Sequence, residues 1–394
     1  MPTPDWDRLT GVLSEHVAAG AVPGAVLAVS RGKETRVAAV GARAMDGDVP
    51  LSGDEVFRIS SMTKPLTAAL TLMLAEEGAL SLEAPIERWV PELARRRVLR
   101  LLDGPIEDTV AAERPITVDD LLTMRMGFGF VLDSPCPALE RAAELGLGIG
   151  PPDPSVSLTP DAWVTRFAEL PLLHQPGADW MYELGFAVLG VVLARAGGQA
   201  LDDLFRDRLL DPLGMTDTGF GVPARARTRL VPCYASGGNG LELFDSADAT
   251  SRWNHRPSFP DARGGLVSTA SDYLRFARML LSGGTHDGTP LMAEQSVAAM
   301  TADHLGADRD RSVSARAFLS AGAGWGYGLE VFTTGVAPAP SMRTTRYGWG
   351  GGLGTTWYSF PDLDTAAVLL TQCLPPPEPL VTAFWSELTA LIGA

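Results

Sequence analysis

The chain has 394 residues, of which 46% are hydrophobic and 20% are charged, a composition typical of a soluble globular protein with two domains or one domain carrying a large insertion. The formal net charge of −15 argues against nucleic acid and anionic membranes as partners, because both repel an acidic surface. No apolar run approaches the length needed to span a membrane.

The cysteines and the first residues indicate the compartment. Cys136, Cys233 and Cys373 have neither the spacing of a zinc site nor that of a redox motif, and an odd number suits a reducing environment. The N-terminal residues carry no basic and apolar export signal, so the sequence predicts a cytoplasmic protein. The five histidines are widely separated and lack metal-ligand spacing, and we expect no metal or cofactor.

The first predicted element is a β-hairpin. Residues 25–29 and 35–40 are two runs of strand-forming residues, and Gly32 lies in the turn between them. Lys33 then lies at the tip of the hairpin, where its side chain is solvated.

The chain contains only two lysines, and each follows a serine by three residues: Ser30 precedes Lys33, and Ser61 precedes Lys64. On a helix, positions i and i+3 share one face, so an ε-amine can reach the hydroxyl and take its proton. This is the arrangement of a serine nucleophile activated by lysine. Because Lys33 is placed in a hairpin, lysine-dependent chemistry is expected at Lys64.

The second pair has a helical context. A short strand over 56–59 leads into a helix that begins at Ser60 or Ser61, because Pro65 fits only in the first turn. Apolar residues continue at helical spacing until Gly78. Ser61 thus lies at a helix N-terminus, where backbone N–H groups favour developing negative charge. On this stretch alone, a capping serine followed by a solvated lysine is the alternative.

The remaining elements are helices in the middle of the chain and strands near its end. This segregation favours an α+β fold over an alternating βαβ sheet. The predicted helices cover 80–93, 117–122 (with Thr117 as N-cap), 161–170, 186–196, 201–210 and 381–392, and the predicted strands cover 265–268, 328–332 and 365–371.

Several segments, in order along the chain, resemble those of the serine β-lactamase and penicillin-binding-protein superfamily on its class C side, and most of all the family VIII carboxylesterases. The resemblance covers the whole chain and implies an antiparallel β-sheet flanked by helices, formed by 1–65 and 225–394. It also implies a mainly helical inserted domain over 66–224, with the active site in the cleft between the two. Besides the Ser-x-x-Lys motif, the segments are 121–123, 212–218, 264–273 and 324–328.

The resemblance implies catalytic roles for Ser61, Lys64 and a tyrosine. Such proteins place a Tyr-x-Asn pattern before a helix; here Tyr182 matches, while Leu184 stands in the place of the asparagine. A phenol beside an ammonium group can accept a proton from the nucleophile and then protonate the leaving group. A packed ring that bonds a carbonyl group is the alternative for Tyr182.

A third motif is expected over 348–354, where β-lactamases have Lys-Thr-Gly. The chain has Trp349, Gly350 and Gly351, which resemble the Trp-Gly-Gly of family VIII esterases. The resemblance implies that the backbone N–H groups of Ser61 and Gly352 form the oxyanion hole. A glycine-rich turn or bulge is the alternative for this segment.

These two differences from the β-lactamase motifs, at Leu184 and Trp349, predict the substrate class. With both lysines assigned, no third-motif lysine can bind the carboxylate of a β-lactam, and Trp349 and Leu184 make the substrate pocket apolar. We therefore expect a small-molecule ester or acyl substrate, cleaved through a Ser61 acyl-enzyme. The alternatives are an acyltransferase or amide synthase using the same acyl-enzyme, a β-lactamase or D-amino-acid peptidase, and a non-catalytic binding protein; the oligomeric state is not predicted.

The sequence leaves open which group takes the proton from Ser61. Lys64 can do so as a neutral amine only if burial and its neighbours lower its pKa from ~10.4 towards ~7–8. If Lys64 stays charged, the phenolate of Tyr182 is the expected base.

Overall fold

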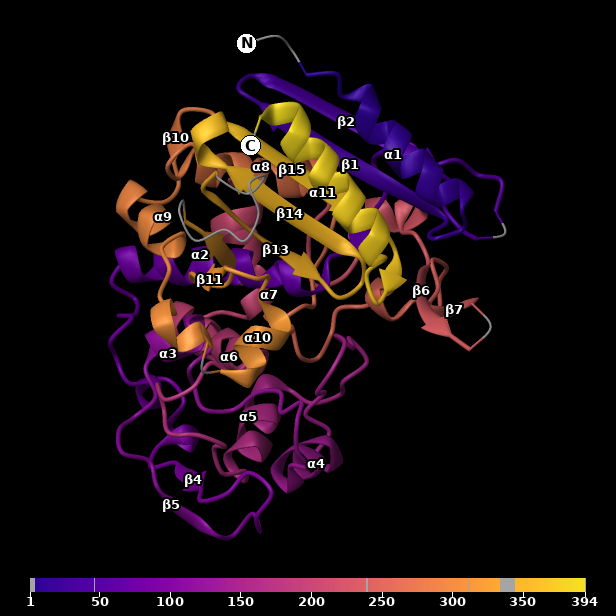
Figure 1. Cartoon of the computed structure of the whole chain (residues 1–394). Helices are drawn as coiled ribbons and strands as arrows, with labels where there is room; N and C mark the ends of the chain where they lie inside the picture. The colour runs from indigo at the N-terminus through magenta and orange to yellow at the C-terminus, as the bar shows by residue number, and fades with distance from the viewer. Residues whose placement is uncertain (1–3, 46, 239, 311, 334–343, 394) are drawn as a thin grey trace.

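The computed structural model describes residues 4–45, 47–238, 240–310, 312–333 and 344–393. Its main element is a seven-stranded antiparallel sheet in the order β11-β12-β13-β14-β15-β1-β2, which confirms the predicted α+β class and the N-terminal hairpin (Figure 1). The strands are β1 Gly24–Arg31, β2 Glu34–Gly41, β11 Gly324–Trp325, β12 Glu330–Phe332, β13 Arg346–Gly351, β14 Thr355–Phe360 and β15 Thr365–Leu370.

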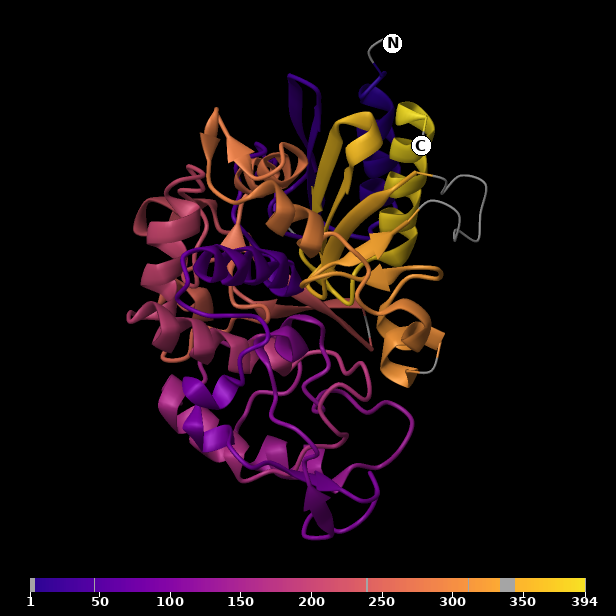
Figure 2. The ribbon, with the colours of Figure 1, turned by 90° about the vertical axis from the view of Figure 1, so that its left-hand side faces the viewer.

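Helices cover both faces of this sheet. α1 (Asp7–Ala18) and α11 (Glu378–Ile392) lie together over one face, and α8 (Ala270–Leu281) packs behind the other (Figures 1 and 2). Both faces need cover because they are apolar, as β1 illustrates: its alternate side chains point to opposite faces of the sheet. Val26 and Ala28 join the large central core, whereas Ala25, Leu27 and Val29 join the core beneath α1 and α11.

A buried helix connects the sheet to the helical part of the chain. A 3₁₀ turn, Ser60–Met62, leads into α2 (Thr63–Glu76), whose first twelve residues are all buried. α2 is thus buried on every side in the protein interior, where it packs against α6 (Gly185–Gly197). The interior position of α2 fixes the residues at its start.

The helical part contains fewer long helices than the sequence predicts. The predicted helix over 80–93 is wrong: the structure has only two 3₁₀ turns, Ile86–Arg88 and Pro91–Leu93. Pro85 and Pro91 each start one of these turns, and proline cannot continue a helix from within. Thr117 does cap a helix, through a capping box with Asp120.

The other elements are short. The helices are α3 Val118–Leu122, α4 Pro137–Glu144, α5 Pro160–Ala168, α7 Leu201–Phe205 (continued by a π-helical turn, Arg206–Leu210), α9 Glu294–Met300 and α10 Val313–Phe318. The strands are β3 Phe57–Arg58, β4 Arg97–Leu99, β5 Thr109–Ala111, β6 Cys233–Gly237, β7 Gly240–Asp245, β8 Val267–Ser268, β9 Thr285–His286, β10 Thr289–Pro290 and β16 Cys373–Leu374. The proposed boundaries at 65 and 225 stay a prediction.

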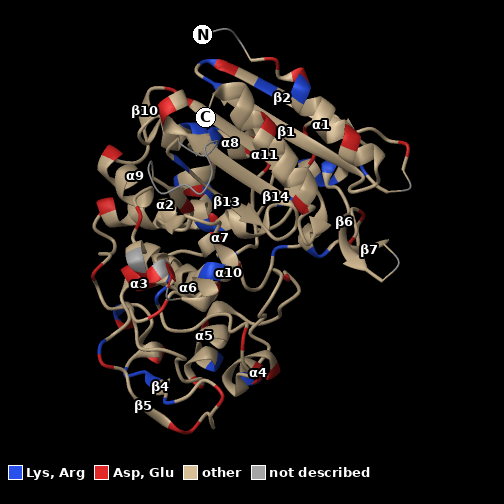
Figure 3. Cartoon of the chain, viewed as in Figure 1, with Lys and Arg blue, Asp and Glu red and all other residues tan. Residues whose placement is uncertain are grey.

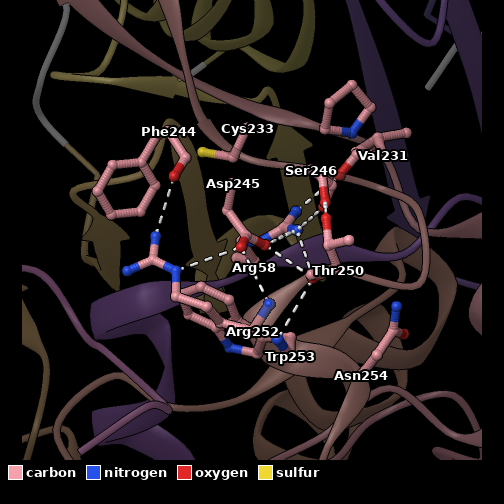
Figure 4. Close-up of polar contacts among 12 residues, drawn as sticks. Arg58, Val231, Cys233, Phe244, Asp245, Ser246, Thr250, Arg252, Trp253 and Asn254 are labelled. Atoms are coloured by element: carbon pink, nitrogen blue, oxygen red, sulfur yellow. Dashed lines mark hydrogen bonds and ion pairs between the residues drawn. The ribbon is translucent and has the colours of Figure 1, made fainter.

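A buried ion pair anchors the strand that leads to Ser61. The Arg58 guanidinium on β3 binds Asp245 at the end of β7, with 2.9 Å between Nε and Oδ2, and also donates to the Val231 carbonyl group at 2.6 Å (Figure 4). Ser251 and the Ser246 carbonyl group complete the set of partners. β3 is therefore held to the β6–β7 ribbon three residues before Ser61.

Asp245→Asn should lower the free energy of unfolding by about 3–5 kcal/mol, because Arg58 would keep a buried charge without its counter-charge. Burial alone would raise the pKa of Asp245, but Arg58 and the other donors hold it below its ordinary value. The stabilisation by this carboxylate is therefore complete at neutral pH and is lost as pH falls through the lowered pKa. Urea unfolding of Asp245→Asn at several pH values measures both effects.

The control is Asp248→Asn, on an exposed residue of the same segment, which should lose much less stability. An Asp245→Asn variant as stable as the wild-type protein at pH 7 would contradict this account of the Arg58 cluster.

Acidic and basic positions are interspersed over the sheet part and the helical part of the chain (Figure 3). Within the described ranges, no helix combines the length and the apolar character that a membrane crossing requires. The cytoplasmic location stays a prediction.

Candidate active site

The i and i+3 spacing brings Lys64 to Ser61. Ser61 lies in the 3₁₀ turn before α2, and Lys64 lies in the first turn of α2, with 3.0 Å between Lys64 Nζ and Ser61 Oγ. The Lys64 side chain is 0% exposed, whereas Ser61 lines a cavity. By contrast, Lys33 is exposed at the hairpin tip, and Ser30 is buried in β1.

Lys64 uses all three of its N–H donors. Besides Ser61, its Nζ donates to Glu183 Oε2 at 2.9 Å and to the Arg263 carbonyl oxygen at 2.8 Å. Three acceptors match a charged ammonium group, which has three donors and no lone pair. Burial alone would lower the pKa of Lys64, but the charge of Glu183 and the Tyr182 hydroxyl raise it above its ordinary value. Lys64 is therefore charged, and the lowered pKa that a neutral base requires is not found.

Tyr182 lies directly before α6, as the motif predicts. Its ring centroid is 4.6 Å from Lys64 Nζ, and its hydroxyl accepts a hydrogen bond of 3.0 Å from Trp349 Nε1. Because an indole N–H can only donate, the Tyr182 hydroxyl keeps its own proton for a further partner. Burial raises the pKa of Tyr182, although Lys64, Ser61 and Trp349 oppose the rise, so the phenol is protonated at neutral pH.

Glu183 was missed by the sequence analysis. It is 6% exposed, forms the ion pair with Lys64, and has a backbone φ of +108°, which is rare for a residue with a side chain. Such strain costs of order 1–3 kcal/mol and persists only where the surroundings enforce it. One signal was available: a fully buried lysine needs a counter-charge, and Glu183 adjoins the tyrosine of the second motif.

A second buried ion pair lies beside the first. Asp261 accepts hydrogen bonds from the Arg263 side chain, including 2.9 Å from Nε to Oδ1 and 2.7 Å from Nη2 to Oδ2, and from the Arg263 backbone N–H group. Arg263 Nη1 is 3.9 Å from Glu183 Oε1. Lys64, Glu183, Arg263 and Asp261 together form a neutral group of four charges behind Ser61.

The end of β13 packs against the turn that carries Ser61. A Cβ atom at Gly351 would collide with the Ile59 carbonyl oxygen, and Thr355 Oγ1 donates to that same oxygen at 3.0 Å. A Cβ atom at Gly352 would be 4.0 Å from Ser60 Oγ. Gly351 therefore lies against the residues that precede the candidate nucleophile, at a point where the strand can approach only without a side chain.

The site opens into a cavity of about 580 Å³. Leu184 is not among its described lining residues: it is fully buried where α6 begins, so its predicted contact with substrate has no support from this geometry. The lining near Ser61 is formed by Tyr182, Phe318, Trp349, Gly350, Gly351 and Gly352, and the far end by residues of α11 and by Glu330, Arg346 and Tyr358.

The cavity wall around Tyr182 is aromatic. The ring centroids of Tyr182 and Phe318 are 4.5 Å apart, and Trp349 meets Trp325 edge to face at 4.9 Å. No group of three or more potential metal-ligating side chains occurs among the residues placed by the structure. The arrangement combines a hydroxyl and a phenol at an aromatic part of the cavity wall with an ammonium group directly behind them, which suits acyl transfer to a serine.

Comparison with known proteins shows which chains and folds this protein is similar to. The chain is 37% identical to Protein Rv1367c of Mycobacterium tuberculosis over 91% of this chain and 87% of that protein. It is 28% identical to Esterase EstB of Burkholderia gladioli over 93% and 90% of the two chains. The solved structure of "EstCE1, a hydrolase with promiscuous acyltransferase activity" has the same fold, with a TM-score of 0.79, 23% identity and 98% of each chain covered.

The family model described as Beta-lactamase matches residues 9–391, nearly the whole chain. The chain therefore belongs to the β-lactamase family of serine hydrolases, in which its relatives include esterases and acyltransferases.

Proposed function

We propose that this protein is a serine esterase that cleaves carboxylic esters of small molecules through an acyl-enzyme on Ser61. The observation that carries the proposal is the contact of the Ser61 hydroxyl with the Lys64 ammonium group at the floor of a cavity walled by Tyr182 and Trp349. The esterase EstB, similar along 93% of this chain, supports the same class of reaction.

The proposed reaction has two acyl-transfer steps. Ser61 Oγ attacks the ester carbonyl carbon, while its proton passes to the groups behind it, and the carbonyl oxygen becomes an oxyanion between the N–H groups of Ser61 and Gly352. The alcohol then leaves with a proton from Tyr182, whose hydroxyl is protonated before the reaction. Water then attacks the acyl-enzyme with the same proton transfers and releases the carboxylic acid.

The cavity supports an ester in preference to a β-lactam. Trp349 occupies the place of the carboxylate-binding lysine, and its indole ring faces the reaction site. Arg346 lines the far end, where its guanidinium stacks 4.0 Å from the Phe332 ring and the buried Glu330 supplies an opposite charge. A substrate carboxylate near Ser61 would lose its hydration without a matching cation, at a cost of several kcal/mol.

The test is a rate comparison between p-nitrophenyl esters of rising acyl length and a chromogenic cephalosporin. We expect ester hydrolysis to exceed cephalosporin hydrolysis by orders of magnitude in kcat/KM. Cephalosporin turnover equal to that of p-nitrophenyl butyrate would contradict the assignment. Transfer of the acyl group to an added alcohol or amine, seen as a new product, would instead identify an acyltransferase using the same Ser61 acyl-enzyme.

Trp349→Lys should lower kcat/KM for esters at least about tenfold, because the hydrogen bond from Trp349 Nε1 becomes charge-assisted as Tyr182 gives up its proton, and such a bond contributes roughly 1.5–3 kcal/mol. The lysine should also raise the affinity for anionic β-lactams. Trp349→Phe is the matched control, since it keeps an aromatic ring and removes only the N–H group that reaches Tyr182. Unchanged cephalosporin affinity in Trp349→Lys would show that Trp349 does not determine the substrate class.

A further inference from the structure

We infer that Glu183 is a positioning residue of the Ser61 site. Acting through Lys64, the Glu183 carboxylate takes up the proton that leaves the Ser61 hydroxyl. The inference rests on the proposed function and names the group that makes Ser61 reactive. Ser61, Lys64 and Glu183 then form a relay in which the lysine lies between hydroxyl and carboxylate, in the position that histidine occupies in a Ser-His-Asp triad.

The contacts place these three residues in a line. Lys64 Nζ is 3.0 Å from Ser61 Oγ and 2.9 Å from Glu183 Oε2, distances at which a proton can pass along hydrogen bonds. Lys64 is 0% exposed and Glu183 is 6% exposed, so little water competes for these protons. The third donor of Lys64 is fixed on the Arg263 carbonyl oxygen, which holds Nζ between its two partners.

The surrounding charges leave Glu183 as the proton acceptor. The groups facing it are Lys64 from α2, Arg263 at 3.9 Å, and Tyr182 from its own loop. Arg263 is already paired with Asp261 through hydrogen bonds from its Nε and Nη2 atoms. Charge from Glu183 raises the pKa of Lys64, and burial raises the pKa of Tyr182, so neither group is a free base at neutral pH. Glu183 is then the anion of the relay, in contact with Lys64 and able to accept its proton.

The backbone also indicates a constrained role for Glu183. Its φ of +108° would suit glycine, yet a glutamate occupies the position. The loop before it is held from several sides: Met181 N–H donates to the Met124 carbonyl group at 2.8 Å, and Tyr182 N–H donates to Ser314 Oγ at 3.2 Å. These contacts hold both the Tyr182 ring and the Glu183 carboxylate towards Lys64 at the expense of backbone strain.

The proton steps balance. A Lys64 Nζ–H bond breaks as a Glu183 Oε2–H bond forms, which leaves a neutral amine beside a neutral acid; burial reduces the cost of forming this neutral pair. Rotation about the Cε–Nζ bond turns the lone pair towards Ser61. The Ser61 O–H bond then breaks and an Nζ–H bond forms, while Oγ bonds to the carbonyl carbon and the π electron pair moves to the carbonyl oxygen.

Collapse of this intermediate returns the proton. The bond between carbon and the leaving oxygen breaks, and that oxygen takes the proton of Tyr182. Tyr182 is reprotonated from Lys64, and Lys64 from Glu183. The net change moves one proton from Ser61 to the alcohol, without oxidant, metal or added acid.

The test is the pH dependence of kcat and KM for Glu183→Gln, which keeps the shape of the side chain and removes the charge. We expect kcat at pH 7 to fall by about 10²-fold or more, within the range of general acid–base catalysis. Because Glu183 does not line the described cavity wall, KM should change little. Without Glu183, burial lowers the pKa of Lys64, so neutral Lys64 accumulates as pH rises, and the acid limb of the rate profile should move to higher pH.

Two further variants separate this role from a structural one. Glu183→Asp keeps the carboxylate and should lower the rate while preserving the wild-type pH profile. Glu87→Gln, on an exposed glutamate, should leave rate and profile unchanged. Circular dichroism and thermal unfolding establish that each variant is folded.

A Glu183→Gln profile parallel to that of the wild-type protein, or a loss confined to KM, would overturn the relay. The esterase proposal fails differently: the wild-type protein would hydrolyse none of the esters, and a serine-reactive phosphonate would not label Ser61 at any pH.

Discussion

Ser61→Ala is expected to abolish ester hydrolysis, a loss of roughly 10⁴-fold or more, while Ser30→Ala and Lys33→Ala leave the rate nearly unchanged. The motif occurs twice, but only the second copy lies where a helix brings Nζ within 3.0 Å of Oγ. The first copy places Ser30 in the sheet, 1% exposed, and Lys33 in solvent at the hairpin tip. The two copies are therefore internal controls for each other.

Mass spectrometry identifies the acylated residue directly. After reaction with a slow acyl donor, the adduct should lie on the peptide that contains Ser61 and should be absent from Ser61→Ala. Ser30→Ala should also fold normally, because its buried hydroxyl has no hydrogen-bond partner within the described structure. An adduct on any serine other than Ser61 would overturn the site.

The parts of the site that the sequence predicts are local. Ser61 and Lys64 are three residues apart, so helix geometry alone brings them together, and Pro65 fixes where that helix begins. The N-terminal hairpin was predictable for the same reason, since its two strands and its turn are contiguous. In both cases the decisive interaction is formed within a few residues, and local periodicity is sufficient.

The parts that the sequence does not predict depend on distant residues. Glu183 is 119 positions from Lys64, and no periodicity links an acidic residue in the loop before α6 to a lysine in α2. The protonation state of Lys64 follows from that pairing, which is why the sequence could not choose between a neutral amine and a phenolate. The predicted helix over 80–93 fails because its two prolines outweigh its apolar spacing.

The charges behind Ser61 explain why a buried lysine is tolerated there. Lys64 and Arg263 contribute two positive charges, and Glu183 and Asp261 contribute two negative ones, all in contact within the interior. Removing one member leaves an unpaired buried charge, whereas moving a proton from Lys64 to Glu183 leaves no new net charge. Such a group can shift protons during a reaction without creating isolated charges.

Tyr182→Phe should reduce kcat at least about a hundredfold with the fold preserved, because the variant loses the hydroxyl that protonates the leaving alcohol. The loss should be larger for alkyl esters than for p-nitrophenyl esters, whose leaving groups need little protonation. A plot of rate against leaving-group pKa should therefore be steeper for the variant than for the wild-type protein. This slope distinguishes a missing acid from a displaced ring, which would slow all esters alike.

The structure also predicts a secondary cost of Tyr182→Phe. Trp349 Nε1 donates to the Tyr182 hydroxyl, and its loss leaves a buried N–H group without that partner, which costs about 1–3 kcal/mol of stability. The double variant Tyr182→Phe with Trp349→Phe should recover part of this stability but none of the activity. Tyr234→Phe, a tyrosine outside the cavity lining whose hydroxyl accepts from the Met45 N–H group, controls for the loss of a phenol elsewhere. Wild-type rates of Tyr182→Phe on an unactivated alkyl ester would remove Tyr182 from the mechanism, because protonation of an alkoxide leaving group cannot be omitted.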